Sequence, residues 1–220
     1  MKPVDIQVTY DFICPWCWIG HRNLKAAAQR LTSEVAPNIT YAPYELNPDM
    51  PATGVDRKEY RSAKFGSWAR SRAMDVEVAI AGKRVGLDFN YDVVAITPNT
   101  RLAHRLMAFA QGSGEVQQSE ALFEAIFAAY FSRGEDIGSI DVLVSLAASV
   151  GFDAQAARDF LSGKRGEAEV VAEEMRAHMK GIRSVPTIRI GSTDLSGAQP
   201  ASVLERALEA VTVPADKLES

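Results

Sequence analysis

The stretch VDIQVTYDFICPWCWIGHRNL, residues 4–24, changes its hydrophobic period half-way along. In its first seven residues apolar and polar side chains alternate, which predicts a β-strand. From Trp16 onward apolar residues recur at helical spacing, and Pro15 suits the first helical position because an N–H there would have no partner. The stretch therefore predicts a strand, a short turn and a helix, with Cys14 and Cys17 at the junction.

Cys14 and Cys17 are the only cysteines of the chain, and two residues separate them. A sulfur anion at a helix N-terminus is stabilised by unpaired backbone N–H groups and by the helix dipole, and the thiolate is the reacting form of a cysteine. Cys17 lies nearly one helical turn further on, so its sulfur can reach back to Cys14. The pair predicts a redox-active dithiol in which Cys14 forms a mixed disulfide and Cys17 resolves it.

Three other interpretations of the cysteine pair are weaker. A zinc site needs four ligands, but there is no second cysteine pair and the three histidines are scattered along the sequence. A structural disulfide across so short a loop adds little stability, and cytosolic thiols are held reduced. Two inert buried thiols do not account for the strand–CxxC–helix context, which is typical of redox motifs. No metal site is therefore expected.

The composition is that of a globular protein. With 220 residues, 47% of them hydrophobic, the chain can bury a full core. Its 24 basic and 28 acidic residues give a net charge of −4, which offers no basic surface for nucleic acid. No apolar stretch approaches the roughly 20 residues that span a bilayer, and the N-terminal residues do not form a signal-peptide core. We therefore expect a cytoplasmic protein with neither nucleic-acid nor membrane partners.

The rest of the chain divides into a helical block between two parts that carry strands. A second strand is predicted at 39–46, where Pro43 suits a sheet edge, and strand patterning returns at 186–190 and 193–196 around a Gly-Ser hairpin signal. Helices are predicted from Trp16 to between 32 and 37, at 60–84 with a break at Gly66, from Asn99 or Thr100, at 120–131, from Ser139, from Asp153 to Leu161, at 167–180 and from Pro200, before a frayed tail after Pro214. The predicted order is β-α-β, a helical block, then β-β-α.

Five stretches carry a resemblance to a known family. They are DFICPWCWIGHRNL at 11–24, PYELNP at 43–48, PNTRLAHRL at 98–106, GIRSVPTIRIG at 181–191 and SGAQP at 196–200. In this order they resemble thioredoxin-fold proteins of the DsbA type. The finer resemblance is to the FrnE-like branch, which is related to 2-hydroxychromene-2-carboxylate isomerases and to kappa-class glutathione transferases.

The resemblance implies an α/β protein with a thioredoxin fold and a large all-helical insertion. The thioredoxin-like domain would be discontinuous, at 1–54 and 181–220, with the insertion at 55–180 between its two parts. It also implies a protein-disulfide oxidoreductase in which Cys14 is the nucleophile and Cys17 the resolving thiol.

The same resemblance implies a cis-proline turn at Val185–Pro186, opposite the dithiol, where substrate backbone would dock. The spacing of the residues alone leaves the isomer open, because most X–Pro bonds are trans. Catalytic residues are thus expected to be Cys14, Cys17 and Pro186. The residues expected to bind substrate are Pro15, Trp16, Val185, Thr187, Asn47 and Asn99.

Three nearby residues, Asp11, Asn99 and His21, each have two interpretations. Asp11 could hold a proton near Cys17 or cap the turn, and Asn99 could line the cleft or cap a helix. His21 could be a proton shuttle, although a surface or partly buried histidine is the better expectation. Trp18 is expected to pack in the core, and His104 to be a hydrogen-bonded structural residue.

Two other functions stay open at this point. The isomerase and kappa-class relatives bind glutathione but carry serine at the position of Cys14, which places the oxidoreductase first. A glutathione-dependent isomerase or transferase, in which Cys14 would activate bound glutathione, is the first alternative. A non-enzymatic binding module that responds to disulfide closure is the second. No tightly bound cofactor is expected, glutathione is a candidate co-substrate, and the substrate is expected to be a protein or small-molecule thiol or disulfide. The oligomeric state is open between monomer and homodimer.

Overall fold

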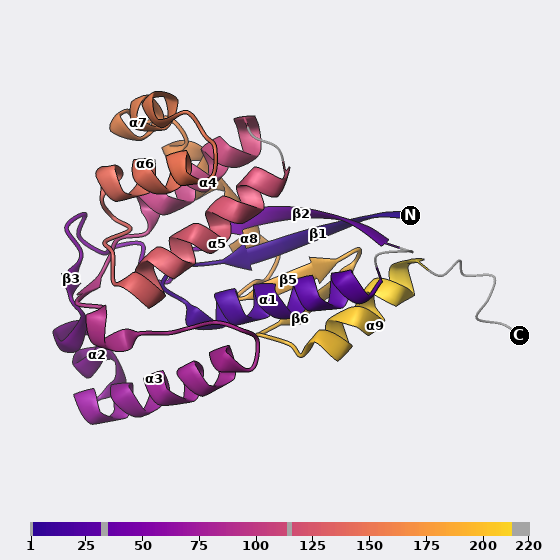
Figure 1. The fold of residues 1–220 in the computed structure, drawn as a ribbon, viewed down its shortest axis with the longest axis horizontal. Coiled ribbons are helices and arrows are strands. Elements are labelled where there is room, and N and C mark those ends of the chain that lie inside the picture. Colours follow the sequence, from indigo (N-terminus) through magenta and orange to yellow (C-terminus); the bar gives the residue numbers. More distant parts are fainter. Residues whose placement is uncertain (1, 32–34, 114–115, 213–220) are drawn as a thin grey trace, which may run out of the picture.

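A four-stranded sheet joins the two ends of the chain in the computed structural model, which describes residues 2–31, 35–113 and 116–212 (Figure 1). Its strands are β1 (Lys2–Tyr10), β2 (Val35–Pro43), β5 (Thr187–Ile190) and β6 (Thr193–Ser196). The order is β2-β1-β5-β6, with β1 and β2 parallel and the other neighbours antiparallel. The strands at both ends of the sequence therefore share one sheet, as the pattern predicts.

The second strand predicted at 39–46 begins four residues and ends three residues later than the observed strand. The structure has β2 at Val35–Pro43, and Pro43 is its last residue, paired with Tyr10 at the sheet edge. Beyond Pro43 the backbone leaves the sheet, because the N–H of Leu46 donates to the Asp11 carboxylate at 2.7 Å. The apolar side chains that follow Pro43 in sequence belong to this loop and not to a strand.

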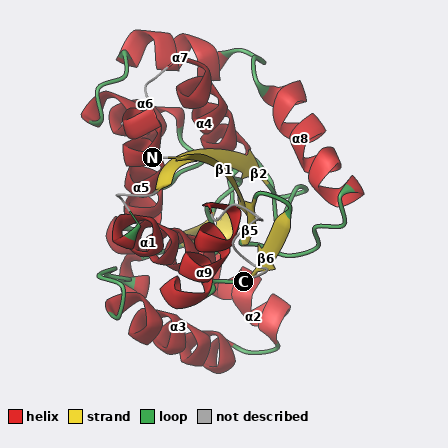
Figure 2. Cartoon of the chain, turned by 90° about the vertical axis from the view of Figure 1, so that its right-hand side faces the viewer, coloured by secondary structure: helices red, strands yellow, loops and turns green. Residues whose placement is uncertain are grey.

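Helices cover both faces of the sheet (Figure 2). On one face α1 (Pro15–Arg30) packs beside α9 (Ala201–Thr212), and α9 also contacts β1 and β5. On the opposite side α8 (Glu167–Met179) lies against β2. The last helix of the chain therefore contacts both the sheet and α1, the helix that starts at the cysteine pair.

The remaining helices form the block between β2 and α8. They are α2 (Arg57–Phe65), α3 (Trp68–Lys83), α4 (Arg101–Ser113), α5 (Val116–Arg133), α6 (Ile140–Ser149) and α7 (Ala154–Ser162), with a 3₁₀ turn, η1, at Tyr91–Val93. Gly66 ends α2 in a left-handed conformation, and the Asp153 side chain caps α7, both at predicted positions. A short pair of strands, β3 (Val55–Asp56) and β4 (Ile96–Thr97), is too brief to leave a periodic signal.

No helix of the described residues is both long and apolar enough to cross a membrane.

The first helix ends slightly earlier than predicted. Helix α1 ends at Arg30, whereas the predicted end lies between residues 32 and 37. The expected frayed tail after Pro214 lies outside the described residues.

Aromatic side chains from β1, α1 and α5 form the centre of the core. Phe127 on α5 is fully buried, and its ring centroid lies 4.9 Å from those of both Phe12 and Phe123. Trp18 on α1 stacks against Phe127 at 5.9 Å, and Tyr10 of β1 lies 4.8 Å from Phe123. This cluster joins the sheet, the cysteine-bearing helix and the helical block into one continuous core.

We expect Phe127→Ala to lower the free energy of unfolding by about 3–5 kcal/mol, because it removes a buried ring and leaves a cavity. Urea unfolding followed by circular dichroism measures this change. The control is Val116→Ala on the same helix, where the side chain is 55% exposed, so its effect should stay within about 0.5 kcal/mol. Equal losses in the two variants would contradict the assignment of Phe127 to the core.

Candidate active site at the start of helix α1

Cys14 is the N-cap residue of helix α1. Its backbone is extended, and the helix starts at Pro15 as the sequence predicts. The Cys14 thiol donates a hydrogen bond to the carbonyl oxygen of Val185 at 3.6 Å. Only 7% of the residue is exposed. The sulfur therefore lies between the first turn of α1 and the loop that carries Val185.

Cys17 lies in the first turn of α1 and is fully buried. Its backbone N–H donates to the Cys14 carbonyl at 3.0 Å, which closes the turn. Burial raises the pKa of the Cys17 thiol well above its ordinary value, and the hydrogen bond with Cys14 and the charge of Asp11 also raise it. Both cysteines are free thiols. Cys17 is therefore a protonated thiol at neutral pH, shielded from solvent.

The loop before β5 packs directly against α1. Its peptide bond between Val185 and Pro186 is cis. The Pro186 ring is so close to α1 that a Cβ on Gly20 would lie 3.2 Å from it. The carbonyl of Pro186 accepts a hydrogen bond from the N–H of Gly197 at 2.8 Å, so the end of β6 also holds the loop. A cis-proline turn thus lies beside the cysteine-bearing end of the helix.

A buried carboxylate precedes the cysteine pair. Asp11 is fully buried, and one of its oxygens lies 3.3 Å from Nε2 of His104, which is also buried on α4. The other oxygen accepts from the N–H of Leu46, and the backbone carbonyl of Asp11 accepts from the N–H of Cys14 at 3.0 Å. Asp11 therefore fixes the turn before Cys14 and also places a charge near Cys17.

Glu124 of α5 binds three side chains of α1. It accepts hydrogen bonds from the Trp18 indole N–H at 2.7 Å and from His21 Nδ1 at 2.8 Å, and it pairs with Arg22 at 3.0 Å. His21 is completely buried, contrary to the expectation of a surface or partly buried residue, and its Nε2 lies 3.0 Å from the Tyr41 hydroxyl. Burial would raise the pKa of Glu124, but its bonds with His21, Trp18 and Arg22 lower it overall.

The loop after β2 is held by α4 and α8. Glu45 accepts from Arg101 Nε at 2.6 Å, and the backbone N–H of Glu45 donates to the Glu174 carboxylate at 2.8 Å. Burial, together with the negative charge of Glu45, raises the pKa of Glu174 to about 7. Because Leu46 follows in the same loop and bonds to Asp11, these contacts fix the segment that passes the cysteine turn.

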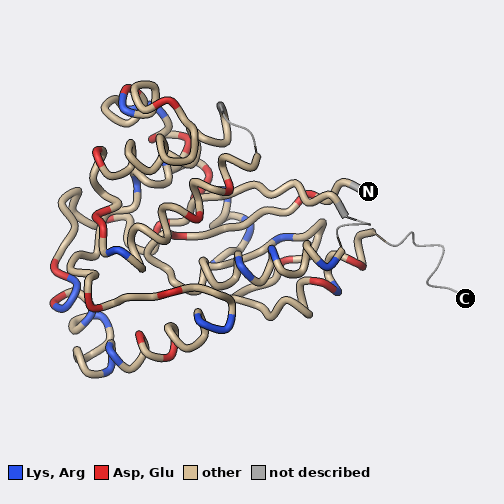
Figure 3. Tube along the Cα trace, in the orientation of Figure 1, with Lys and Arg blue, Asp and Glu red and all other residues tan. Residues whose placement is uncertain are grey.

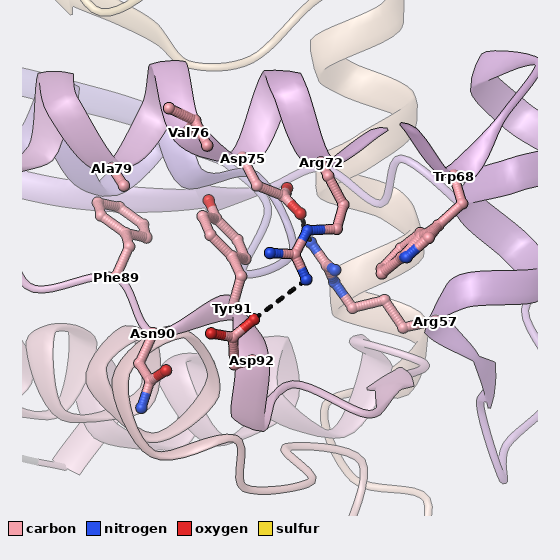
Figure 4. Close-up of a pocket in the computed structure, with 10 residues that line it drawn as sticks. All are labelled: Arg57, Trp68, Arg72, Asp75, Val76, Ala79, Phe89, Asn90, Tyr91 and Asp92. Carbon is pink, nitrogen blue, oxygen red and sulfur yellow. Dashed lines mark hydrogen bonds and ion pairs between the residues drawn. The ribbon is translucent and has the colours of Figure 1, made fainter. Parts of the chain in front are cut away.

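A cavity of about 270 Å³ borders Cys14, and its lining comes largely from α2, α3 and α5. Figure 3 shows basic positions along α2 and the first turns of α3. Arg57 of α2 donates to both carboxylate oxygens of Asp75 at 2.8 and 2.9 Å, and Arg61 reaches the same carboxylate at 3.0 Å. Figure 4 shows Arg57 and Asp75 as they line a neighbouring pocket, where Arg57 lies beside the Trp68 ring.

Two of the residues expected to bind substrate line this cavity together with Cys14. They are Pro15 and Trp16, and Trp16 is 41% exposed. Val185 does not line the cavity, but its carbonyl oxygen accepts the hydrogen bond from the Cys14 thiol. Thr187 is buried, and its hydroxyl donates to the Ser184 carbonyl at 2.8 Å within the same loop.

The two asparagines of the expected set are not among the residues that line the cavity. Asn47 is adjacent to it, because its side-chain oxygen accepts hydrogen bonds from Tyr60 and Lys64, which do line it. Asn99 bonds to the Met50 carbonyl at 2.6 Å and accepts from the N–H of Arg101 at 2.9 Å. The structure thus places Asn99 in the loop that starts α4.

The sequence matches the model of the DSBA-like thioredoxin domain over residues 5–209. The chain belongs to the DSBA-like thioredoxin domain family. It is 28% identical to the uncharacterized protein YwbO of Bacillus subtilis (strain 168), over 93% of this chain and 96% of that protein.

Solved structures of the DSBA-like thioredoxin domain family and its neighbours share the fold. The probable DsbA oxidoreductase SCO1869 from Streptomyces coelicolor is similar with a TM-score of 0.84 and 25% identity, over 94% of this chain and 89% of that chain. A 2-hydroxychromene-2-carboxylate isomerase is similar with a TM-score of 0.72 and 19% identity, over 98% of this chain and all of that chain, 100%. At this identity the second likeness shows the fold alone.

Sequence reasoning missed the residues that surround the DsbA-like cysteine pair from the helical block. Glu124 was read only as part of a helix, and nothing in its neighbourhood indicates that it faces α1. The cavity cations do leave a signal, since Arg57, Arg61 and Lys64 follow one another at spacings of four and three residues. That spacing places all three on one side of a helix.

We expect Glu124→Gln to lower the free energy of unfolding by about 1–3 kcal/mol at pH 7, because charge-assisted bonds to α1 are lost. The pKa of Glu124 is lowered on folding, so this contribution is full above the ordinary glutamate value and disappears as pH falls through the folded-state pKa. Urea unfolding at neutral and acid pH measures the difference between variant and wild type. The matched control is Glu120→Gln one turn earlier, which removes only the half-exposed pair with Lys25. A difference that grows on acidification would contradict the prediction.

Glu174 should show the opposite pH dependence. Its pKa rises on folding from 4.5 to about 7, so the folded protein loses stability as pH increases through that window. Glu174→Gln keeps the acceptor for the Glu45 N–H and removes the titration. As pH rises from 5 to 8, we expect the free energy of unfolding of the variant to increase relative to wild type, because the variant has no carboxyl to ionise. The expected gain is about 1–2 kcal/mol, since solvent screening of a half-buried carboxyl reduces the effect. A relative stability that is flat with pH would contradict the raised pKa.

Proposed function

We propose that the protein is a thiol–disulfide oxidoreductase that acts through Cys14 and Cys17. The observation that carries the proposal is the position of the Cys14 sulfur, at the N-terminus of α1 and 3.6 Å from the carbonyl oxygen of Val185 beside a cis-proline turn. The second thiol, Cys17, lies one turn further into the helix. The membership of the DSBA-like family supports the same chemistry.

The first step is attack by the Cys14 thiolate on a substrate disulfide. One substrate sulfur bonds to Cys14, and the other leaves as a thiolate. Cys14 takes this role because it borders the cavity, whereas Cys17 is completely buried. The backbone of Val185 and the exposed Trp16 offer polar and apolar contacts for the substrate on the two sides of the sulfur.

The second step is attack by Cys17 on the Cys14 sulfur of the mixed disulfide. A bond forms between the two cysteines, the substrate leaves as a second thiolate, and two electrons have passed from protein to substrate. Cys17 must lose its proton in this step, and burial raises its pKa. We assign the uptake of that proton to Asp11, which is buried beside the turn and paired with His104.

Substrates in this proposal are thiols and disulfides of proteins or small molecules. Glutathione is proposed as a co-substrate that restores the dithiol, and the chemistry uses no tightly bound cofactor. The same steps run in reverse when the protein disulfide oxidises a substrate dithiol, so the direction depends on the reduction potential of the pair.

The test is the equilibrium of Cys14 and Cys17 in glutathione redox buffers, followed by alkylation of free thiols. We expect a two-electron transition with closure of the Cys14–Cys17 disulfide. A midpoint near the thioredoxin value of about −270 mV would favour reduction of substrates, and one near about −120 mV would favour oxidation. Cys17→Ser should abolish dithiol turnover and stop at a mixed disulfide.

The likeness to the isomerase fold supplies the competing outcome. If no intramolecular disulfide forms and the protein only binds glutathione, the oxidoreductase proposal fails and a glutathione-dependent isomerase or transferase takes its place. Retention of full catalytic turnover by Cys17→Ser would lead to the same conclusion. Reversible partner binding without any turnover would instead favour a redox-responsive binding module.

A further inference from the structure

The cavity beside Cys14 contains more cationic than anionic side chains. Arg57, Arg61 and Lys64 all line it, and Asp75 is the one carboxylate among its lining residues. Arg57 and Arg61 share that carboxylate. Two positive charges are therefore left without a compensating carboxylate in the lining, in a protein whose net charge is −4.

Lys64 carries the more accessible of these charges. Its ammonium group donates to the Tyr60 hydroxyl at 2.8 Å and to the Asn47 side-chain oxygen at 3.3 Å, and both partners are neutral. No carboxylate within the described part of the chain pairs with it in an ion pair. Lys64 is exposed, so an incoming anion can reach it without displacing a salt bridge.

One polar group in the wall of the cavity lacks a hydrogen-bond partner among the described residues. The Tyr91 hydroxyl is buried, and no group within the described ranges forms a hydrogen bond with it. Tyr91 lines the cavity and lies under the Arg57 guanidinium, whose central carbon is 4.9 Å from its ring centroid. Buried hydroxyl groups normally have a partner. The cavity wall at Tyr91 therefore carries a hydroxyl that no described residue satisfies.

The rest of the cavity is mainly apolar. Its lining includes Ile13, Leu46, Phe65, Met74, Val78 and Phe131. An apolar cavity of about 150 Å³ can hold a benzene ring, so the volume of about 270 Å³ suits an aromatic ring with one or two substituents. The site therefore combines a mainly apolar cavity, an excess of two positive charges and the Cys14 sulfur.

We propose that this cavity binds small disulfides with an apolar or aromatic body and a carboxylate, and that Lys64 selects the carboxylate. The inference rests on the oxidoreductase function proposed above and names its small-molecule substrate class. Lys64 acts as a specificity-determining residue, and Asn47 and Tyr60 hold its ammonium group at the cavity.

The reaction in the cavity follows the chemistry of the cysteine pair. Cys14 attacks the sulfur of the arm that is bound in the cavity, the disulfide of the substrate breaks, and the other arm leaves as a thiolate. Cys17 then attacks Cys14, and the bound arm leaves as a second thiolate. The substrate gains two electrons and the protein becomes a disulfide. A dithiol such as dithiothreitol returns it to the starting state.

The experiment compares two chromogenic disulfides on the reduced full-length protein. Dithiobis(nitrobenzoate) is aromatic and anionic, and dithiodipyridine is aromatic and neutral. Stopped-flow absorbance gives the rate constant for release of the first thiolate from each. The quantity of interest is the rate constant for dithiobis(nitrobenzoate) divided by that for dithiodipyridine. Any change in the reactivity of Cys14 itself affects both rate constants and cancels in this ratio.

We expect Lys64→Gln to lower this ratio by about fivefold, as for the loss of an exposed charge pair, and Lys64→Glu to lower it further. The matched controls are Lys58→Gln and Lys58→Glu, which make the same charge changes on α2 at an exposed position that does not line the cavity. These controls should keep the wild-type ratio. Added salt should lower the ratio in the wild type and have little effect in Lys64→Gln.

Two results would overturn the inference. One is an equal change of the ratio in the Lys64 and Lys58 variants. The net charge of the protein, and not the position of Lys64, would then explain the effect. The other is a ratio that none of the substitutions changes. The first-thiolate rates are independent of Cys17, so the test also works in Cys17→Ser. The oxidoreductase function is read separately, since the wild type should release two thiolates per chain and Cys17→Ser one.

Discussion

The carboxylate of Glu124 is the interaction on which the position of the cysteine-bearing helix depends. It comes from the helical block and binds Trp18, His21 and Arg22, which all belong to α1. A buried carboxylate that accepts several hydrogen bonds fixes direction as well as distance, because each donor has its own preferred geometry. Helices α9 and α3 also contact α1. Helix α1 is thereby held against both parts of the structure, and its N-terminus meets the cis-proline turn at a fixed place.

That placement has a consequence for the order of the chemistry. Cys14 is the N-cap residue at the boundary between the thioredoxin-like layer and the helical block, whereas Cys17 is enclosed by the first turn. The same burial that shields Cys17 raises its pKa, so in the proposed reaction it stays a thiol until a mixed disulfide forms next to it. Asp11 is fixed by Leu46 and His104, which belong to separate segments of the chain. The redox pair therefore relies on contacts distant in sequence, although its two sulfurs are adjacent.

Local signals in the sequence were sufficient for the fold and for the cysteine pair. The change of period at Cys14, the hairpin signal at Gly191 and the break at Gly66 all reflect backbone preferences that act over a few residues. The cis isomer at Pro186 was expected from the family resemblance and not from local spacing, and the structure has it. The complete burial of His21 could not be predicted, because it depends on packing between segments far apart in the chain. The second strand was misplaced for the same reason, since the Asp11 carboxylate takes the N–H of Leu46. The cavity cations were visible as a spacing, but their meaning required Asp75 and the neighbouring elements.

Two different parts of the chain border Cys14. One is the turn at Val185, whose carbonyl oxygen accepts from the Cys14 thiol. The other is the cavity, whose charges come from α2 in the helical block. The helices of this block contact α1 but contribute neither sulfur, so substitutions in α2 can alter the charge of the cavity without altering the redox pair. In the proposed function, the fold thus separates the two sulfurs that exchange electrons from the α2 side chains that select the substrate.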